Sequence, residues 1–216
     1  MQHVEQHLPS LRHEYPVVFD VGRPARYDRA QVALRILILA LLGALSAPLG
    51  WLFGVLYLAL PAIAAVGISS RSAATFQVEL SGDVVRIIRW VLSFYAYLLL
   101  LTDRFPQWSV PESLVRFEVT PSGTPTVGTA LLRLVYTVPY ALVLAVFGCA
   151  AALIWVICLV SVLAGAGVPR GLYDFLRGVM RWQARLFAYH ASLVDEYPPW
   201  SFDTEPLSPE NVGSSG

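Results

Sequence analysis

The chain has 216 residues, of which 56% are hydrophobic and 14% are charged, with a formal net charge of zero and a mean hydropathy of +0.59. Soluble domains carry roughly a quarter charged residues. This composition therefore excludes an ordinary soluble domain, because too little polar surface is left to face water.

Several residues recur at fixed spacings, which indicates one module built twice. The following pairs lie 92 positions apart: Arg89 and Arg181, Trp90 and Trp182, Tyr97 and Tyr189, Asp103 and Asp195, Phe105 and Tyr197, Pro106 and Pro198. Upstream, Phe19-Asp20-Val21 and Arg35 recur as Phe117-Glu118-Val119 and Arg133 at a spacing of 98. We therefore expect a polar tail (1–14), a first membrane module (15–108), a second membrane module (113–202) and a disordered tail (203–216).

Each module begins with a short alternating stretch, at 15–21 and at 114–119. Alternation of this kind is typical of strands. We expect the two stretches to pair as a small sheet at the membrane surface.

A long apolar run follows in each module. From Ala33 to Ser70 the only charge is Arg35, and from Thr129 to Val168 the only charge is Arg133. Each run is roughly twice the length that crosses a bilayer as a helix. The runs therefore predict an integral membrane protein.

Within each run we expect a helical hairpin. The first would join helices at 31–47 and 50–68 through a turn at 46–50, and the second would join helices at 129–147 and 149–165 near Gly148. The turn signal at Gly148 is poor. One long tilted helix starting after Pro139 is the alternative for the second run.

Each module ends with an amphipathic segment, at 82–102 and at 171–196. The second segment carries charged residues on one stripe, namely Arg170, Asp174, Arg177, Arg181 and Arg185. Three arginines near the middle of a span would cost about 2.5–3.5 kcal/mol each. A helix lying in the membrane interface keeps them in water. The first segment alone could be a short span, but its equivalence to the second favours the surface.

These elements predict an all-α membrane protein with about four transmembrane helices, two interfacial helices and short strand-like segments at the surface. Neither hairpin tip is charged, so every arginine falls on one face, which the positive-inside rule assigns to the cytoplasm. We expect a multi-pass protein of the bacterial inner membrane with both termini in the cytoplasm.

The second module carries Arg170-Gly171-Leu172-Tyr173-Asp174-Phe175, Arg181-Trp182 with Arg185, and Asp195-Glu196-Tyr197-Pro198-Pro199-Trp200. In these motifs the chain resembles a bacterial membrane family described only as a domain of unknown function, number 4389. The resemblance covers residues 15–202, closely in the second module and more loosely in the first. The resemblance implies a membrane location, but it does not point to any particular activity.

The sequence offers no catalytic set, no cofactor loop and no convincing metal site. His3 and His7 would share a helical face, but a polar tail is the better interpretation of residues 1–14. The Asp-x-aromatic-Pro motif at Asp103 and Asp195 is interpreted as structural, because proline ends helices. Six arginines are candidate contacts for anionic lipid headgroups or a partner: Arg35, Arg133, Arg170, Arg177, Arg181 and Arg185.

Arg35 and Arg133 would reach a lipid phosphate or pair with Asp20 and Glu118. His190 lies on the apolar side of its segment and is expected to be packed or interfacial.

We expect a non-enzymatic accessory, scaffold or assembly subunit of a larger membrane complex. The expected partners are membrane lipids and another membrane subunit or a second copy of the chain, with no nucleic acid. A lipid- or small-solute-handling transporter or scramblase is the alternative.

Overall fold

The computed structural model describes residues 15–44, 49–71, 75, 81–107 and 115–202. Both predicted tails and most of the predicted turn at 46–50 lie outside these residues.

Two short strands form the sheet that was predicted from the alternating stretches. Strand β1 (Val17–Val21) pairs antiparallel with β2 (Val115–Val119), and Phe19 lies opposite Phe117. Because strand side chains alternate between faces, both phenylalanines are buried, while Val18, Arg116 and Glu118 are exposed on the outer face. The strand prediction is confirmed.

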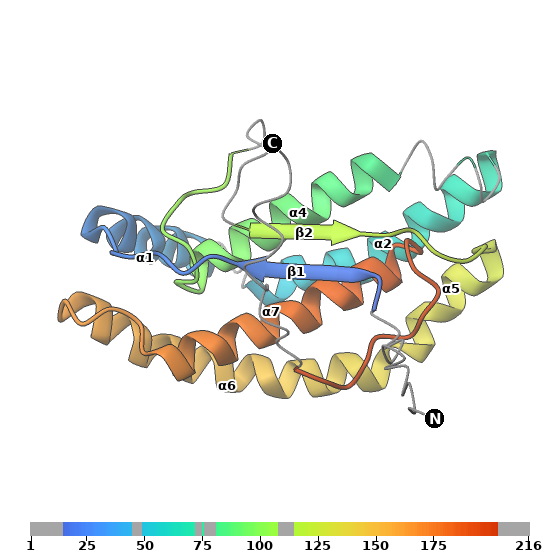
Figure 1. Ribbon diagram of the computed structural model, residues 1–216. Coiled ribbons are helices and arrows are strands. Elements are labelled where there is room, and N and C mark those ends of the chain that lie inside the picture. Colours follow the sequence, from blue (N-terminus) through green and yellow to red (C-terminus); the bar gives the residue numbers. More distant parts are fainter. Residues whose placement is uncertain (1–14, 45–48, 72–74, 76–80, 108–114, 203–216) are drawn as a thin grey trace, which may run out of the picture.

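Helices α4 (Ser81–Leu98) and α7 (Arg170–His190) form the layer behind the sheet, with α4 against β2 and α7 against β1 (Figure 1). These are the two segments that were predicted to lie on the membrane surface. In α7 the apolar side packs into the core, as Leu176 and Met180 do, and the arginine stripe faces the sheet. The expectation that the arginines of α7 lie in water is wrong for Arg181, which is buried against β1. An amphipathic pattern shows only that one side of a helix requires polar neighbours. Here the backbone carbonyls and the carboxylate of β1 take the place of water as partners for the arginines.

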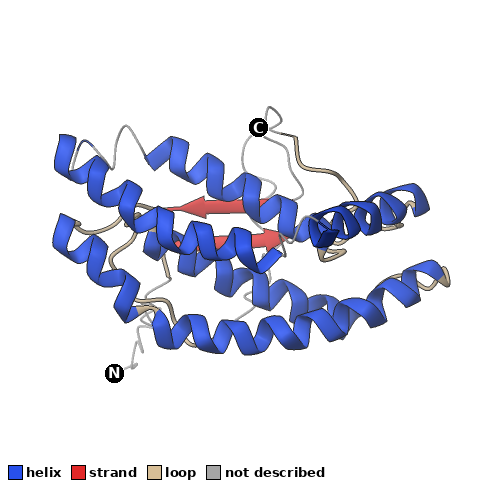
Figure 2. Ribbon diagram, turned by 180° about the vertical axis from the view of Figure 1, so that it is seen from behind, coloured by secondary structure: helices blue, strands red, loops and turns tan. Residues whose placement is uncertain are grey.

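The apolar helices form a further layer. They are α1 (Arg29–Ala44), α2 (Leu49–Arg71), α5 (Val127–Tyr136) and α6 (Val138–Leu163). In Figure 2, which views the molecule from the side opposite to Figure 1, helices lie in front of the two strands. Helices α1 and α2 occupy the residues of the first predicted hairpin, but in the described part of the chain they do not pack along each other: α1 contacts α4, and α2 packs against α5 and α7. The prediction of a hairpin here is therefore wrong.

The predicted turn near Gly148 is wrong, because α6 continues through that residue. The chain breaks at Thr137 instead, which ends α5 and begins α6, with Pro139 in the first turn of α6. Proline fits the first turn of a helix, where its missing N–H would have had no partner. The alternative of one long helix from Pro139 matches the structure.

Among the described residues, α6 is the helix long and apolar enough to cross a membrane. The apolar part of α2 (Gly54–Ser70) and α5 fall short of that length. At 1.5 Å per residue, a ten-residue helix such as α5 reaches only about 15 Å. Four transmembrane helices are therefore not supported.

Helices α4 and α7 end in the same way. Leu100 and Ser192 take left-handed backbone angles, with φ of 63° and 57°. The next N–H groups reach back to carbonyls in the last turn, from Leu101 to Ala96 at 2.9 Å and from Leu193 to Ala188 at 3.1 Å. This is the Schellman arrangement of a helix C-terminus.

Glycine at these two positions should have opposite effects on stability. Ser192→Gly should stabilise the protein by about 1 kcal/mol, because it relieves the left-handed angle and removes a buried hydroxyl that has no hydrogen-bond partner. Leu100→Gly should instead destabilise it by about 2 kcal/mol or more, because a buried leucine is lost. Denaturant unfolding in mild detergent measures both, and equal shifts of the same sign would contradict this account.

Candidate functional site

Among the described residues three arginines are buried: Arg181 on α7, at 7% exposure, and two that lie on apolar helices. The fractional exposure is 0% for Arg35 on α1 and 3% for Arg133 on α5. A guanidinium this deep is costly unless it is paired with an anion and hydrogen-bonded. Each therefore has to be explained by its partners.

Arg35 is held by the segment that follows α4. Its Nη2 donates to the Thr102 carbonyl at 2.6 Å and to Asp103 Oδ1 at 3.0 Å. The guanidinium carbon lies 4.3 Å from the centre of the Tyr97 ring. The second oxygen of Asp103 accepts the backbone N–H of Asp28 at 2.8 Å. We call Arg35, Tyr97 and Asp103 the first arginine cluster.

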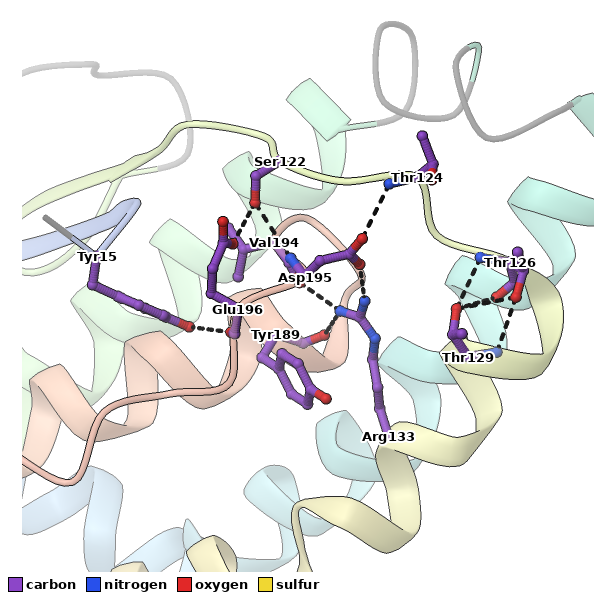
Figure 3. Close-up of polar contacts among 10 residues, drawn as sticks. All are labelled: Tyr15, Ser122, Thr124, Thr126, Thr129, Arg133, Tyr189, Val194, Asp195 and Glu196. Carbon is purple, nitrogen blue, oxygen red and sulfur yellow. Dashed lines mark hydrogen bonds and ion pairs between the residues drawn. The ribbon is translucent and has the colours of Figure 1, made fainter. Parts of the chain in front are cut away.

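Arg133 is held in the same manner by the segment that follows α7 (Figure 3). Its Nη1 donates to the carbonyls of Tyr189 and Val194, both at 2.6 Å, and its Nη2 pairs with Asp195 Oδ1. The guanidinium carbon lies 4.4 Å from the centre of the Tyr189 ring. Asp195 Oδ2 accepts the N–H of Thr124 at 3.0 Å. Arg133, Tyr189 and Asp195 form the second arginine cluster.

The segment before α5 closes over the second cluster (Figure 3). Ser122 Oγ accepts the N–H of Asp195 and donates to the Glu196 carboxylate. Gly123 has φ of 79°, and a Cβ there would lie 1.7 Å from Asp195 Oδ2. Glycine is therefore required by both the backbone angle and the close approach of this carboxylate.

The predicted pairing of the buried arginines with Asp20 and Glu118 is wrong. Asp20 accepts instead from Arg181 Nη2 at 3.0 Å, and Glu118 pairs with Arg116 at 2.8 Å. The hydrogen bond from Arg116 lowers the pKa of Glu118. Asp103 and Asp195 were predicted to be structural residues at helix ends, but their role as anions for the buried arginines was not predicted. The signal was available, since each arginine recurs together with its tyrosine and aspartate.

The arginines along α7 contact strand β1, a carboxylate of α7 itself, and the segment that follows α7. Arg181 Nε donates to the Phe19 carbonyl at 2.9 Å, and burial lowers the pKa of this arginine. Arg177 pairs with Asp174 at 2.9 Å, and Arg185 donates to the Ser201 carbonyl at 2.8 Å.

Of the six arginines predicted to contact lipid or a partner, Arg170 is exposed and the other five are buried or half-buried. Arg170 stands at the first position of α7.

The tryptophans of the repeat stack on aromatic neighbours. Trp90 stacks on Phe94 with ring centres 5.7 Å apart, and Trp182 stacks on Tyr140 at 4.6 Å. The Trp182 indole N–H also donates to the Ser201 carbonyl. Trp182 thus joins α7 to α6, whereas Trp90 and Phe94 both lie on α4.

The other repeated residues are structural as well. Pro106 and Pro198 are buried, and the Tyr197 hydroxyl donates to the Tyr136 carbonyl at 3.3 Å. Arg89 lies close enough to Glu118 for its charge to help lower the pKa of that carboxyl.

His190 is packed between helices. Its ring centre lies 4.2 Å from that of Tyr57, and its Nε2 lies 3.3 Å from Thr137 Oγ1. Burial, assisted by the charge of Arg133, lowers the pKa of His190 to about 4. The expectation of a packed histidine is confirmed.

In the arginine clusters both aspartates are fully engaged, whereas Nε and Nη1 of Arg35 are buried without a hydrogen-bond partner among the described residues. In each cluster, one carboxylate oxygen accepts from the guanidinium and the other from a backbone N–H. This arrangement suits a structural tie better than general base catalysis, which requires a carboxylate within reach of a substrate proton. Within the described residues, no group of three or more metal-binding side chains comes together.

These features define a mainly helical protein. Its described part contains one helix that is apolar and long enough to cross a membrane, which is a weak indication of membrane association. A family model described as a domain of unknown function (DUF4389) matches residues 128–201, which include the second arginine cluster. The resemblance is thus supported for the second module. Comparison with curated proteins and with solved structures gave no match.

Neutralising the aspartate of either cluster should destabilise the fold, because a buried arginine then lacks its anion. We expect about 2 kcal/mol for Asp103→Asn and less for Asp195→Asn, since the two carboxylate side chains are 17% and 39% exposed. The control Glu118→Gln, in an exposed ion pair, should change stability by about 0.5 kcal/mol or less. Denaturant unfolding in detergent measures all three, and equal losses in the control and the cluster variants would refute the role of the clusters.

Stability should also fall as the pH drops from 6.5 to 4 because of His190. In this window the unfolded histidine binds a proton while the folded one, with its pKa near 4, stays neutral. Relative to His190→Gln, which cannot titrate, the native protein should lose about 3 kcal/mol by pH 4. If the free energies of unfolding of the two proteins changed in parallel with pH, this expectation would be contradicted.

Proposed function

We propose that this chain is a non-catalytic protein of the bacterial inner membrane that acts as an accessory or assembly subunit of a larger membrane complex. One observation supports it most: apolar side chains project from four helices, while the buried charged groups are tied to partners within the chain. A surface of this kind needs a cover of lipid, of another membrane protein, or of both.

The exposed apolar side chains extend over every apolar helix. Among the most exposed are Leu37 on α1, Leu58 and Val66 on α2, and Val135 on α5, each at 64–68%. On α6 the exposed residues include Leu142, Val146, Leu153, Val156, Ile157 and Val160. Monomeric soluble proteins rarely expose contiguous apolar surface on this scale.

The alternative, a transporter or scramblase for lipids or small solutes, needs polar groups that line a path through the membrane. Arg35 and Arg133 were the candidates for that path, and each pairs with a carboxylate and lies against a tyrosine ring. Arg35 also donates to one backbone carbonyl and Arg133 to two. Their engagement favours a structural role. The exposed Arg170 remains a candidate contact for anionic headgroups.

We also propose that the two modules arose by duplication. Three matches beyond the sequence support it: the two arginine clusters, the two left-handed helix ends, and the pairing of Phe19 with its counterpart Phe117. Each late helix packs against the strand of the other module, α4 on β2 and α7 on β1. The modules would then be related by an approximate twofold axis near the two phenylalanines.

The assembly role is tested by changing the exposed faces of α1 and α2. Leu37→Gln and Leu58→Gln should remove a specific membrane protein from the complex purified in mild detergent, because a polar side chain at a dry interface weakens docking. Val18→Gln, on the outer face of the sheet, is the matched control and should leave the complex intact. Mass spectrometry identifies the partner.

Purification of the chain alone from all three variants and from the native protein would contradict the proposal. Lipid or solute movement in reconstituted vesicles that Arg133→Ala abolishes, in a variant that remains folded, would establish the alternative.

A further inference from the structure

The first part of helix α6 packs against α7 in antiparallel orientation, while Trp155 further along α6 donates to the Leu98 carbonyl at the end of α4. Near the start of α6, Tyr140 stacks on Trp182, and two turns later Phe147 meets Phe175 edge to face with ring centres 6.3 Å apart. Rising numbers on α6 thus meet falling numbers on α7. Whatever position the first part of α6 takes in a membrane, α7 must take beside it.

Helix α7 is in turn bound to the polar sheet. Arg181 donates to the Phe19 carbonyl and pairs with Asp20, and Arg177 also reaches Asp20 at 3.4 Å. On the outer face of the sheet, Arg116 and Glu118 are exposed. Helix α6, helix α7 and the strands extend across the molecule in the same broad direction (Figure 1).

If α6 crossed the membrane, it would therefore draw the charged residues of α7 and the sheet into the bilayer. The arginines of α7, Asp20, and the outer edges of a two-stranded sheet would enter the hydrocarbon region. Charges there are costly, and open sheet edges facing lipid do not occur, because their N–H and C=O groups find no partner. The length and composition of α6 suit a transmembrane helix, but its contacts with α7, and through α7 with the sheet, do not.

The side of α6 that faces away from α7 is apolar along the helix. Exposed residues recur every three or four positions, as Leu142, Val146, Cys149, Leu153, Val156 and Val160. The opposite side, with Tyr140, Leu144, Ala151, Cys158 and Val162, is buried. A helix of 26 residues measures about 39 Å, longer than the ~30 Å hydrocarbon core. A helix that lies in the membrane plane has no such limit.

We propose that the protein is embedded in one leaflet, with α6 lying in the plane of the membrane. The exposed side of α6 contacts the acyl chains, and the outer face of the sheet lies in water. This arrangement rests on the membrane location in the proposed function and replaces the crossing helices that the sequence predicted. The partner of the α6 face is lipid, which leaves α1 and α2 for docking.

Fluorescence quenching in vesicles tests the depth of α6. A Cys158→Ala protein carries a bimane at Cys149, and two further variants, with Cys149→Ala added, carry it at Leu142→Cys or Val160→Cys. The vesicles contain phosphatidylethanolamine and phosphatidylglycerol with quenchers at known acyl depths. An in-plane helix places all three probes at one depth within a few ångströms. A crossing helix separates residues 142 and 160 by about 27 Å along the membrane normal.

The outcomes distinguish the two proposals. Val18→Cys in the same cysteine-free background is the water-facing control and should not be quenched by acyl-chain quenchers. A depth gradient from residue 142 to residue 160 in vesicle-bound protein would overturn the in-plane arrangement alone. Bound protein with no quenching at all three α6 positions would show a protein cover on α6 and also overturn it. Failure to bind vesicles would reject the membrane location itself.

Sidedness supplies a second readout. A membrane-impermeant maleimide should label Thr124→Cys and Ala166→Cys from the same side of sealed membrane vesicles, since these exposed positions lie in the segments before α5 and after α6. The Thr124 hydrogen bond is made by its backbone N–H and survives the substitution. Labelling of the two positions from opposite sides would contradict a single-leaflet location.

Discussion

The cost of burying a guanidinium organises this fold. Arg35 and Arg133 sit on helices with apolar surroundings, and each can stay there only with an anion and several acceptors at hand. The chain supplies both from a turn that ends a later helix. The left-handed residues Leu100 and Ser192 reverse the chain, so that the following aspartate and carbonyl return to the arginine. Each cluster thereby ties an early helix of its half to the end of a late one.

A second consequence of the same rule is the layered arrangement of polarity. The outer face of the sheet is polar, α7 turns arginines toward β1, and the outer helices turn apolar side chains away from the sheet. The exposed apolar side chains of the outer helices thus lie away from the polar outer face of the sheet. Such an arrangement satisfies a membrane surface without requiring any arginine to pass through the hydrocarbon region.

Much of the fold was predictable from the sequence, and the misses share a physical cause. Alternation identified both strands, and Pro139 marked the start of α6. Hydropathy alone overestimated the number of spans, because it does not report which helices pack lengthwise on charged ones. The amphipathic pattern of α7 identified a helix with one polar side, but it could not distinguish water from β1 as the neighbour. The recurrence of Arg, Tyr and Asp was seen, yet their contact depends on the reversal at Leu100 and Ser192, which are not glycines.

The central claim is that each buried arginine and its aspartate stabilise the fold together. A double-mutant cycle at the first cluster measures this directly, with Arg35→Met, Asp103→Asn and the double variant unfolded in detergent. The account predicts a coupling free energy of about 2 kcal/mol, since residues in one buried network lose their interaction only once. Additive losses from the two single substitutions would contradict it.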